Sequence, residues 1–215
     1  MRQLSGLDAS FLHMEDDRVT GHVGGLIVLD PTTAEREIDA DAIRQHIAER
    51  LAVLPPLRWK LVEVPFGFDR PYWIDDHDVD LDFHVRGIAL PKPGSKQQLI
   101  DQVNRLHARR LDRSHPLWEF YVIEGLEGGK VAIFMKCHHA AIDGKAAMQI
   151  LSTLMSQEPD ALPPSSPENM PPSETRPTEI EMFTRGWLGV MTHPGRAMAL
   201  IARYAVEWQT ALGRF

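Results

Sequence analysis

Two β-rich runs near the middle of the chain, residues 117–124 and 130–137, flank the glycine-containing segment 125–129. This pattern predicts a β-hairpin, because glycine permits the turn that lets a second strand pair with the first. The second run leads directly into the sequence HHAAIDG at 138–144, and apolar residues at helical spacing follow at 147–155. We therefore expect HHAAIDG to lie between a strand and a helix, a position that commonly carries functional side chains.

Other strands and helices are predicted before the hairpin. Two helices are expected: one runs from a cap at Asp39 or Asp41 to Leu54, just before Pro55, and the other begins at Ser95. Each has apolar residues at helical spacing on one side. Strands are expected at 22–29, 57–64, 71–74 and 81–90.

The composition divides the chain into three parts. Residues 1–157 form the predicted domain, and residues 158–178 are rich in Pro, Ser and Glu, which is typical of a linker. Residues 179–215 predict two amphipathic helices with Trp187 and Trp208 on their apolar faces. These faces can pack on a further domain, on this domain or on a lipid surface, and we favour a further domain.

The totals exclude several kinds of protein. The 215 residues are 43% hydrophobic and 25% charged, as in ordinary globular domains, and the net charge of −7 argues against binding to nucleic acid. The single cysteine and the absence of a signal-peptide pattern favour the cytoplasm. No run approaches the roughly 18 apolar residues of a membrane span, so we expect any contact with a membrane or lipid droplet to be peripheral.

His138 and His139 are the candidate general bases, because a histidine near its usual pKa accepts protons at neutral pH. Side chains alternate along a strand, so one ring is expected to enter a cleft while the other packs away from it. Asp143 can hydrogen-bond within the turn or pair with an arginine, and Gly144 permits unusual backbone conformations. We expect no metal site, because the spacing of His139 and Asp143 lacks a third ligand, and we expect Cys137 to be a small core residue.

HHAAIDG matches HHxxxDG, the signature of the chloramphenicol acetyltransferase-like superfamily. The opening LSGLDASFLHMEDD, the following HVGGLIVL, and the segment LDRSHPLWEFYVIEGLEGGKVAIFMKCHHAAIDG resemble the wax ester synthase/diacylglycerol acyltransferase family over residues 4 to about 155. The resemblance implies an α/β fold, a two-layer α+β sandwich that forms one half of an acetyltransferase-like enzyme, with a mixed, largely antiparallel sheet and flanking helices.

The resemblance also implies an activity. The acyl group of acyl-CoA would pass to diacylglycerol or a long-chain alcohol, with His139 as general base, no acyl-enzyme and no cofactor besides the co-substrate acyl-CoA. His138 would orient the turn and Asp143 would hold it through a salt bridge. The segment Pro116, Leu117 and Trp118 would lie near the acyl site, although packing in the core is the simpler expectation for Trp118.

Family members are about twice as long, so the resemblance also implies a carboxyl-terminal half as a partner in completing the site. An alternative is an inactive or incomplete half that binds lipid or a partner, or a split enzyme that needs a second chain. A condensation-type acyltransferase uses the same motif on carrier-bound acyl groups, but the segment 116–118 argues against it.

Overall fold

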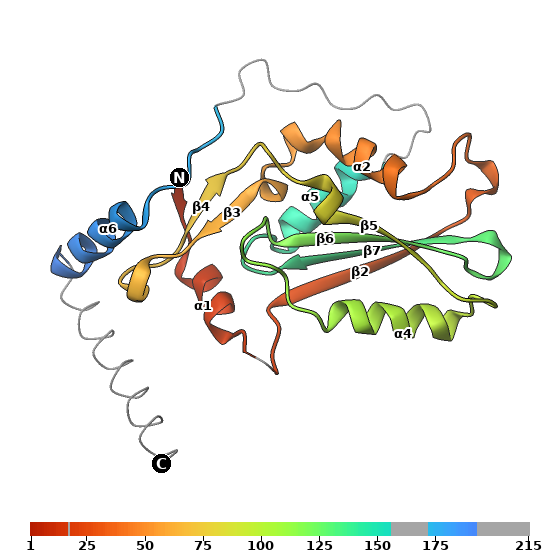
Figure 1. The fold of residues 1–215 in the computed structure, drawn as a ribbon, viewed down its shortest axis with the longest axis horizontal. Coiled ribbons are helices and arrows are strands. Elements are labelled where there is room, and N and C mark those ends of the chain that lie inside the picture. The colour runs from red at the N-terminus through yellow and green to blue at the C-terminus, as the bar shows by residue number, and fades with distance from the viewer. Residues whose placement is uncertain (17, 156–171, 193–215) are drawn as a thin grey trace, which may run out of the picture.

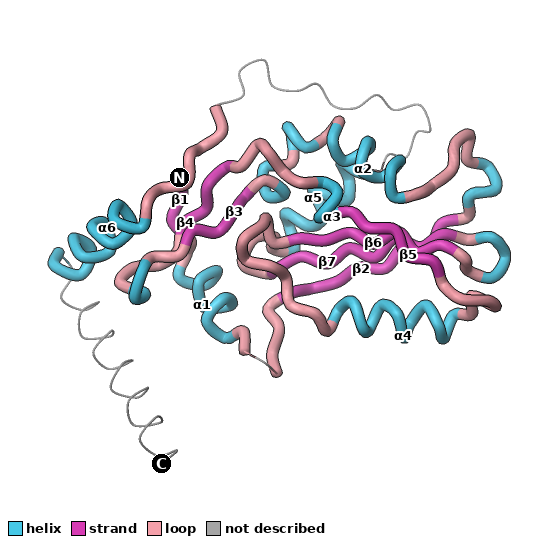
Figure 2. The backbone as a smooth tube through the Cα atoms, viewed as in Figure 1, coloured by secondary structure: helices cyan, strands magenta, loops and turns pink. Residues whose placement is uncertain are grey.

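A four-stranded sheet forms the centre of the molecule, and a smaller three-stranded sheet lies beside it (Figures 1 and 2). The computed structural model describes residues 1–16, 18–155 and 172–192. The larger sheet has the order β2-β7-β6-β5, and only its β5–β6 pair is parallel. The predicted mixed, largely antiparallel sheet is therefore confirmed. Its strands are β2 (His22–Leu29), β7 (Val131–His138), β6 (Trp118–Glu124) and β5 (Val85–Ala89).

The smaller sheet is antiparallel throughout and has the order β1-β4-β3. It consists of β1 (Arg2–Gln3), β4 (Tyr72–Asp75) and β3 (Trp59–Val62). Backbone pairing of Arg2 with Trp73 brings the start of the chain against a strand about seventy residues away. This sheet supplies one side of the candidate site described below.

Helices cover both faces of the larger sheet (Figure 1). On one face lies α4 (Lys96–His107), and on the other lie α2 (Ala40–Ala48) and α5 (Gly144–Leu154). The predicted caps are present, since the side chains of Asp39 and Ser95 accept backbone hydrogen bonds at the starts of α2 and α4. The other long helices within the described residues are α1 (Gly6–Met14) and α6 (Glu179–Thr192). Single 3₁₀ turns lie at Pro31–Thr33, Leu51–Val53, Pro55–Leu57, Pro65–Gly67 and Glu127–Gly129.

Two predicted elements differ from the structure. The strand expected at 81–90 begins with a helical turn, α3 (Leu81–His84), because the Asp80 side chain accepts a hydrogen bond from the Phe83 N–H and caps it. The helix expected to reach Leu54 ends at Ala48. Leu54 precedes a proline, which disfavours helical backbone, and it has φ −118° and ψ 65°.

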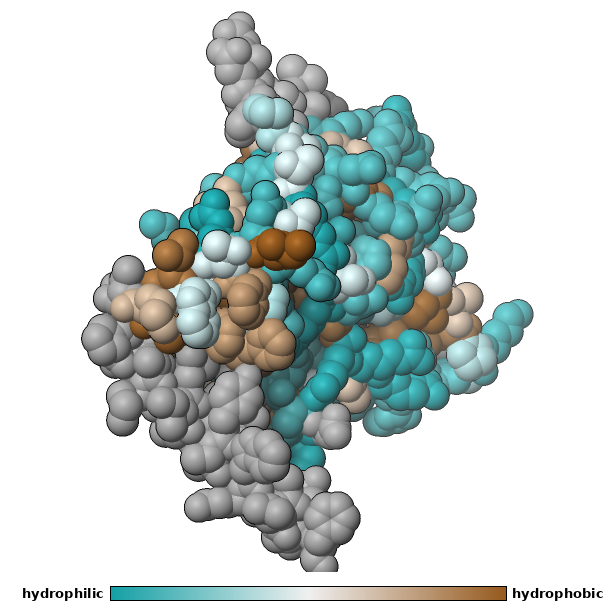
Figure 3. Space-filling model, turned by 60° about the vertical axis from the view of Figure 1, so that its left-hand side comes forward, coloured by the Kyte–Doolittle hydropathy of each residue, from teal (hydrophilic) through white to brown (hydrophobic). Residues whose placement is uncertain are grey.

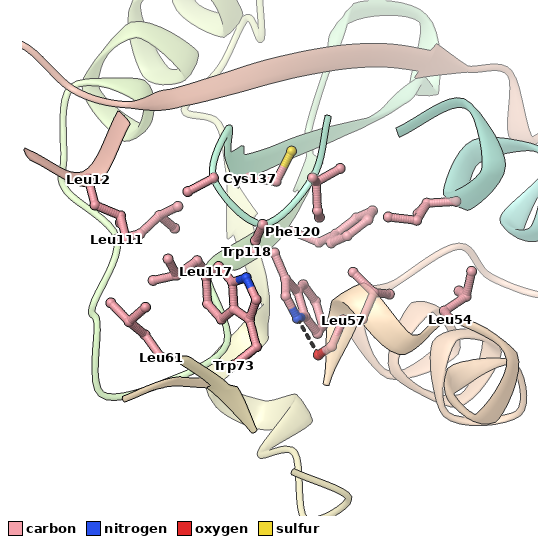
Figure 4. Close-up of a cluster of buried hydrophobic side chains, with 14 of the residues drawn as sticks. Leu12, Leu54, Leu57, Leu61, Trp73, Leu111, Leu117, Trp118, Phe120 and Cys137 are labelled. Carbon is pink, nitrogen blue, oxygen red and sulfur yellow. Dashed lines mark hydrogen bonds between the residues drawn. The ribbon is translucent and has the colours of Figure 1, made fainter. Parts of the chain in front are cut away.

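The main core lies between the larger sheet and the elements that cover one of its faces, among them the segment 54–73, and it includes Trp118 (Figure 4). The indole Nε1–H of Trp118 donates to the Leu57 carbonyl oxygen at 2.7 Å, so the buried polar group is satisfied. Cys137 is completely buried, and burial raises the pKa of its thiol to about 11. The prediction that Cys137 is a core residue is confirmed.

One face of α6 packs on this domain, and its other face is exposed. Met182 and Gly186 are buried, and the Trp187 ring lies 6.1 Å from that of Phe68. Ile180, Met191 and their neighbours remain exposed, and Figure 3 shows hydrophobic residues at the surface on this side of the molecule. Packing on this domain thus accounts for only part of the apolar face of α6. The second predicted amphipathic helix and most of the predicted linker lie outside the described residues.

Candidate active site

The HHAAIDG segment forms the predicted connection between β7 and α5. His138 ends β7, and its backbone N–H donates to the Leu117 carbonyl at 2.9 Å. The backbone N–H groups of Ala141 and Ile142 both donate to the His138 carbonyl, at 3.0 and 3.1 Å, and close a tight turn. Asp143 then caps α5 by accepting a hydrogen bond from the Ala146 N–H at 2.7 Å. The turn is therefore fixed by backbone bonds on one side and by a helix cap on the other.

His138 is buried, with a relative exposure of 1%. Its Nδ1 accepts a hydrogen bond from the Ala140 N–H at 3.1 Å, and burial lowers its pKa to about 4, although the nearby Glu15 carboxylate opposes that shift. The ring is therefore neutral at pH 7 and inaccessible to a substrate. These properties suit a residue that shapes the turn.

His139 lies in the turn just after β7, and its ring has different surroundings from the ring of His138. Its ring stacks on Phe11 of α1, with centroids 4.4 Å apart and an interplanar angle of 22°. Its backbone N–H donates to the Gly21 carbonyl at 2.8 Å. The ring lines a cavity of about 340 Å³, and its Nδ1 is buried without a hydrogen-bond partner among the described residues. Of the two histidine rings, that of His139 lines this cavity and that of His138 does not.

The cavity of His139 is lined by both aromatic and polar side chains. Trp59 and Trp73 of the smaller sheet line it, with ring centroids 6.4 Å apart, and the Arg2 guanidinium lies 3.9 Å from the centroid of Trp59. Aromatic side chains beside the His139 imidazole suit a reaction at the polar end of an otherwise apolar molecule. The lining residues are Arg2, Gln3, Leu4, Ser5, Asp8, Trp59, Trp73, His139, Ala140, Ala141, Asp143 and Ala146.

A larger groove of about 1050 Å³ lies at the other end of α1. The start of α1 lines the His139 cavity, whereas Leu12, His13 and Glu15 at its end line the groove. Arg110, Arg113 and Arg176 contribute positive charge, but Glu15, Glu63, Asp69 and Glu179 contribute carboxylates. The mixed charge of the groove identifies no particular ligand.

Two expectations about the end of the motif change. Asp143 is exposed and forms a local hydrogen bond as a helix cap, which is one of the two roles expected for it, and within the described ranges no cation forms the salt bridge that the resemblance implies. Gly144 is the first residue of α5, its φ is outside the left-handed region, and a Cβ there would meet no atom within 4 Å. The backbone therefore does not require glycine at position 144.

The segment Pro116, Leu117 and Trp118 is buried, and none of the three lines a described cavity. Its clearest link to the site is the Leu117 carbonyl, which accepts the His138 N–H. The structure therefore places these residues behind the motif, in the core, where they support the turn.

Several residues around the histidines were not singled out from the sequence. Phe11 and Glu15 lie within the opening segment that carries the resemblance, and this segment was the only signal for them. Trp59 and Trp73 have no motif and reach the site only through sheet pairing. Among the residues that the structure describes, no group of three His, Cys, Asp or Glu side chains is arranged to hold a metal, and no helix is long and apolar enough to cross a membrane.

Residues 4–212 match the wax ester synthase/diacylglycerol acyltransferase catalytic domain. A relative from Mycobacterium tuberculosis, named "Probable diacyglycerol O-acyltransferase tgs3", is 37% identical over 93% of this chain and 72% of its own length. Another from that organism, Rv0221, is named for the same activity and is 35% identical over all of this chain but only 44% of its own length. The chain thus spans less than half of some curated relatives.

Two solved structures are similar in fold to this chain. The wax ester synthase/diacylglycerol acyltransferase from Marinobacter aquaeolei VT8 is 31% identical, with a TM-score of 0.65 over 76% of this chain and 40% of that one. The starter condensation domain of rhizomide synthetase RzmA has a TM-score of 0.56 at 10% identity, over 71% of this chain and 34% of that one. The latter likeness concerns the fold alone, and it agrees with the acetyltransferase-like architecture implied by the motif.

Proposed function

We propose that this chain, which belongs to the wax ester synthase/diacylglycerol acyltransferase family, takes part in acyl transfer from acyl-CoA to the hydroxyl of diacylglycerol or a long-chain alcohol. The observation that carries the proposal is the position of His139, whose ring lies on the wall of a cavity while His138 is buried. The products would be triacylglycerol or a wax ester. The relatives' names support the class of reaction, and the apolar cavity wall supports a lipid acceptor.

In the proposed mechanism His139 removes the proton from the acceptor hydroxyl as the oxygen attacks the thioester carbonyl. A carbon–oxygen bond forms and the carbon–sulfur bond breaks, and the proton passes from His139 to the departing CoA sulfur. The stacked ring of Phe11 restricts the orientation of the imidazole. No acyl-enzyme is formed, because the acceptor oxygen attacks the thioester directly.

The proposal includes a carboxyl-terminal half of the enzyme as a partner, because the relatives extend beyond the matched region. A cavity of about 340 Å³ is too small for a long acyl chain and its acceptor together, so a second domain would supply the rest of the site. The exposed face of α6 is a candidate contact for that domain, or for a peripheral membrane or lipid-droplet surface.

The test measures the release of CoA thiol from palmitoyl-CoA with diacylglycerol or hexadecanol as acceptor. The chain is assayed alone and mixed with the part of Rv0221 that lies beyond the matched region. His139→Ala should lower the rate by about 10²–10⁴-fold, the usual contribution of a general base. His13→Gln is a matched control, because His13 is an exposed histidine that does not line the His139 cavity.

A rate within about tenfold of wild type for His139→Ala would contradict the assignment of the base. Activity only after mixing would indicate a split enzyme. Absence of turnover in both arms, together with binding of the lipid or of the added domain, would favour the alternative of a non-catalytic binding module.

A further inference from the structure

Glu15, a buried carboxylate beside His138, has no role in the proposed mechanism. It follows α1 directly, and its side chain is only 4% exposed. One carboxylate oxygen, Oε2, lies 2.9 Å from Arg113 Nη2 and 3.8 Å from His138 Nε2. A buried charge in this position requires a partner, and Arg113 supplies it.

Arg113 holds the Glu15 carboxylate in one place. The same guanidinium donates to the Leu12 carbonyl at 2.8 Å and to Glu63 Oε1 at 3.0 Å. Burial opposes ionisation of Glu15, but the hydrogen bond from Arg113 and the neighbouring positive charge lower its pKa. Glu15 is therefore ionised at neutral pH and fixed against the end of α1.

The hydrogen bonds of His138 determine which ring nitrogen carries its proton. Because Nδ1 accepts the Ala140 N–H, the proton of the neutral ring lies on Nε2. That Nε2–H has no hydrogen-bond partner within the described part of the chain, and the Glu15 carboxylate is a negatively charged group close to it. The attraction between the carboxylate and the N–H dipole favours this tautomer and this ring orientation.

The backbone of Gly21 connects the contact between Glu15 and His138 to His139. Its carbonyl accepts the His139 N–H at 2.8 Å, and its own N–H donates to Glu15 Oε1 at 3.5 Å. A Cβ on Gly21 would lie 2.6 Å from His138 Nε2, so the backbone packs directly against the buried ring. A displacement of the His138 ring would therefore be transmitted to the backbone that holds His139.

We propose that Glu15 is a positioning residue for the acyl transfer: its carboxylate orients the Nε2–H of His138, and thereby the turn that presents His139 to the cavity. The inference rests on the proposed function, in which His139 is the base. Glu15 lines the larger groove but not the His139 cavity, so it does not contact a group that reacts at His139 and acts on the reaction through His138. An alternative role, a purely structural ion pair with Arg113, would affect stability without a specific effect on turnover.

The test compares Glu15→Gln with the matched control Glu63→Gln, which removes the other carboxylate from the same guanidinium. We expect Glu15→Gln to lower kcat on the order of 10-fold to 100-fold, the scale of a misplaced catalytic group, with KM changed by less than about threefold. Ring ¹⁵N NMR of the 215-residue chain should show a protonated Nε2 on His138 in wild type and in Glu63→Gln. In Glu15→Gln that proton should exchange at least about tenfold faster.

Glu15→Asp keeps the negative charge but shortens the side chain by one methylene, which withdraws the carboxylate from His138 Nε2, and this variant decides the matter if Glu15→Gln does not fold. It should reproduce both the loss in kcat and the change in the His138 signal. The proposal is overturned if kcat stays within about threefold of the control, or if kcat falls while the His138 signals stay unchanged. If wild type shows no acyl transfer, the proposed function fails, and the NMR comparison still decides whether Glu15 orients His138.

Discussion

Lys136 forms a buried charged network two residues before the motif, and its replacement gives a quantitative test of the fold. Its ammonium donates to the carbonyl of Leu106 in the last turn of α4 at 3.1 Å and to that of Arg109, just after the helix, at 2.7 Å. It also lies 3.2 Å from Glu119 Oε2 on the neighbouring strand β6, and Tyr121 O–H donates to that oxygen at 2.7 Å. The network therefore connects β7, which carries the motif, to β6 and α4.

Lys136→Met should lower the free energy of unfolding, because it leaves the buried Glu119 carboxylate without its lysine partner. Removing one partner of a buried ion pair typically costs about 3–5 kcal/mol. Arg86 Nη2 still lies 3.6 Å from the other oxygen of Glu119, so we expect a loss near 3 kcal/mol, the lower end of that range. For a chain of this length that loss corresponds to a decrease in Tm of about 6–12 °C. Methionine is nearly as long as lysine, so loss of packing adds little.

Urea unfolding followed by tryptophan fluorescence measures the change. Lys145→Met replaces an exposed lysine and should change the free energy of unfolding by less than about 0.5 kcal/mol. The double variant Lys136→Met/Glu119→Gln should be more stable than Lys136→Met alone, because it removes the uncompensated carboxylate. A loss below about 1 kcal/mol for Lys136→Met, or a double variant no more stable than the single one, would refute this account of the network.

Two further predictions concern pH and the helix cap. Burial lowers the pKa of His84 to about 4. Between about pH 6.5 and 4, therefore, the His84 side chain is protonated in the unfolded chain but not in the folded one. The free energy of unfolding should fall by up to about 3 kcal/mol as the pH falls through that window. Unfolding measured from pH 4 to 8 should show a weaker pH dependence in His84→Gln, and an unchanged dependence would contradict the assignment. Asp143→Ala removes the cap of α5 and should lower the free energy of unfolding, measured in urea, by about 0.5–2 kcal/mol. A decrease of about 3–5 kcal/mol would instead indicate that Asp143 forms a buried salt bridge.

Local signals in the sequence predicted much of the larger sheet and its helices. The strands at 22–29, 117–124 and 130–137 and the caps Asp39 and Ser95 all lie where the pattern placed them, within a residue or two. These features depend on side-chain periodicity and on hydrogen bonds between near neighbours in the chain. The predicted strand at 81–90 was wrong at its start, because the Asp80 cap favoured a helical turn that the alternation of apolar residues concealed.

The sequence alone determined the connection between β7 and α5, the presence of two candidate histidines within it and the resemblance to an acyltransferase family. The tertiary structure decided which ring faces the cavity and which lies against Glu15, a residue more than a hundred positions away. It also placed Trp59 and Trp73 on the cavity wall. The physical reason is that secondary structure depends on residues that are neighbours in the chain, whereas the burial and the surroundings of His138 and His139 depend on sheet pairing and on packing between distant segments.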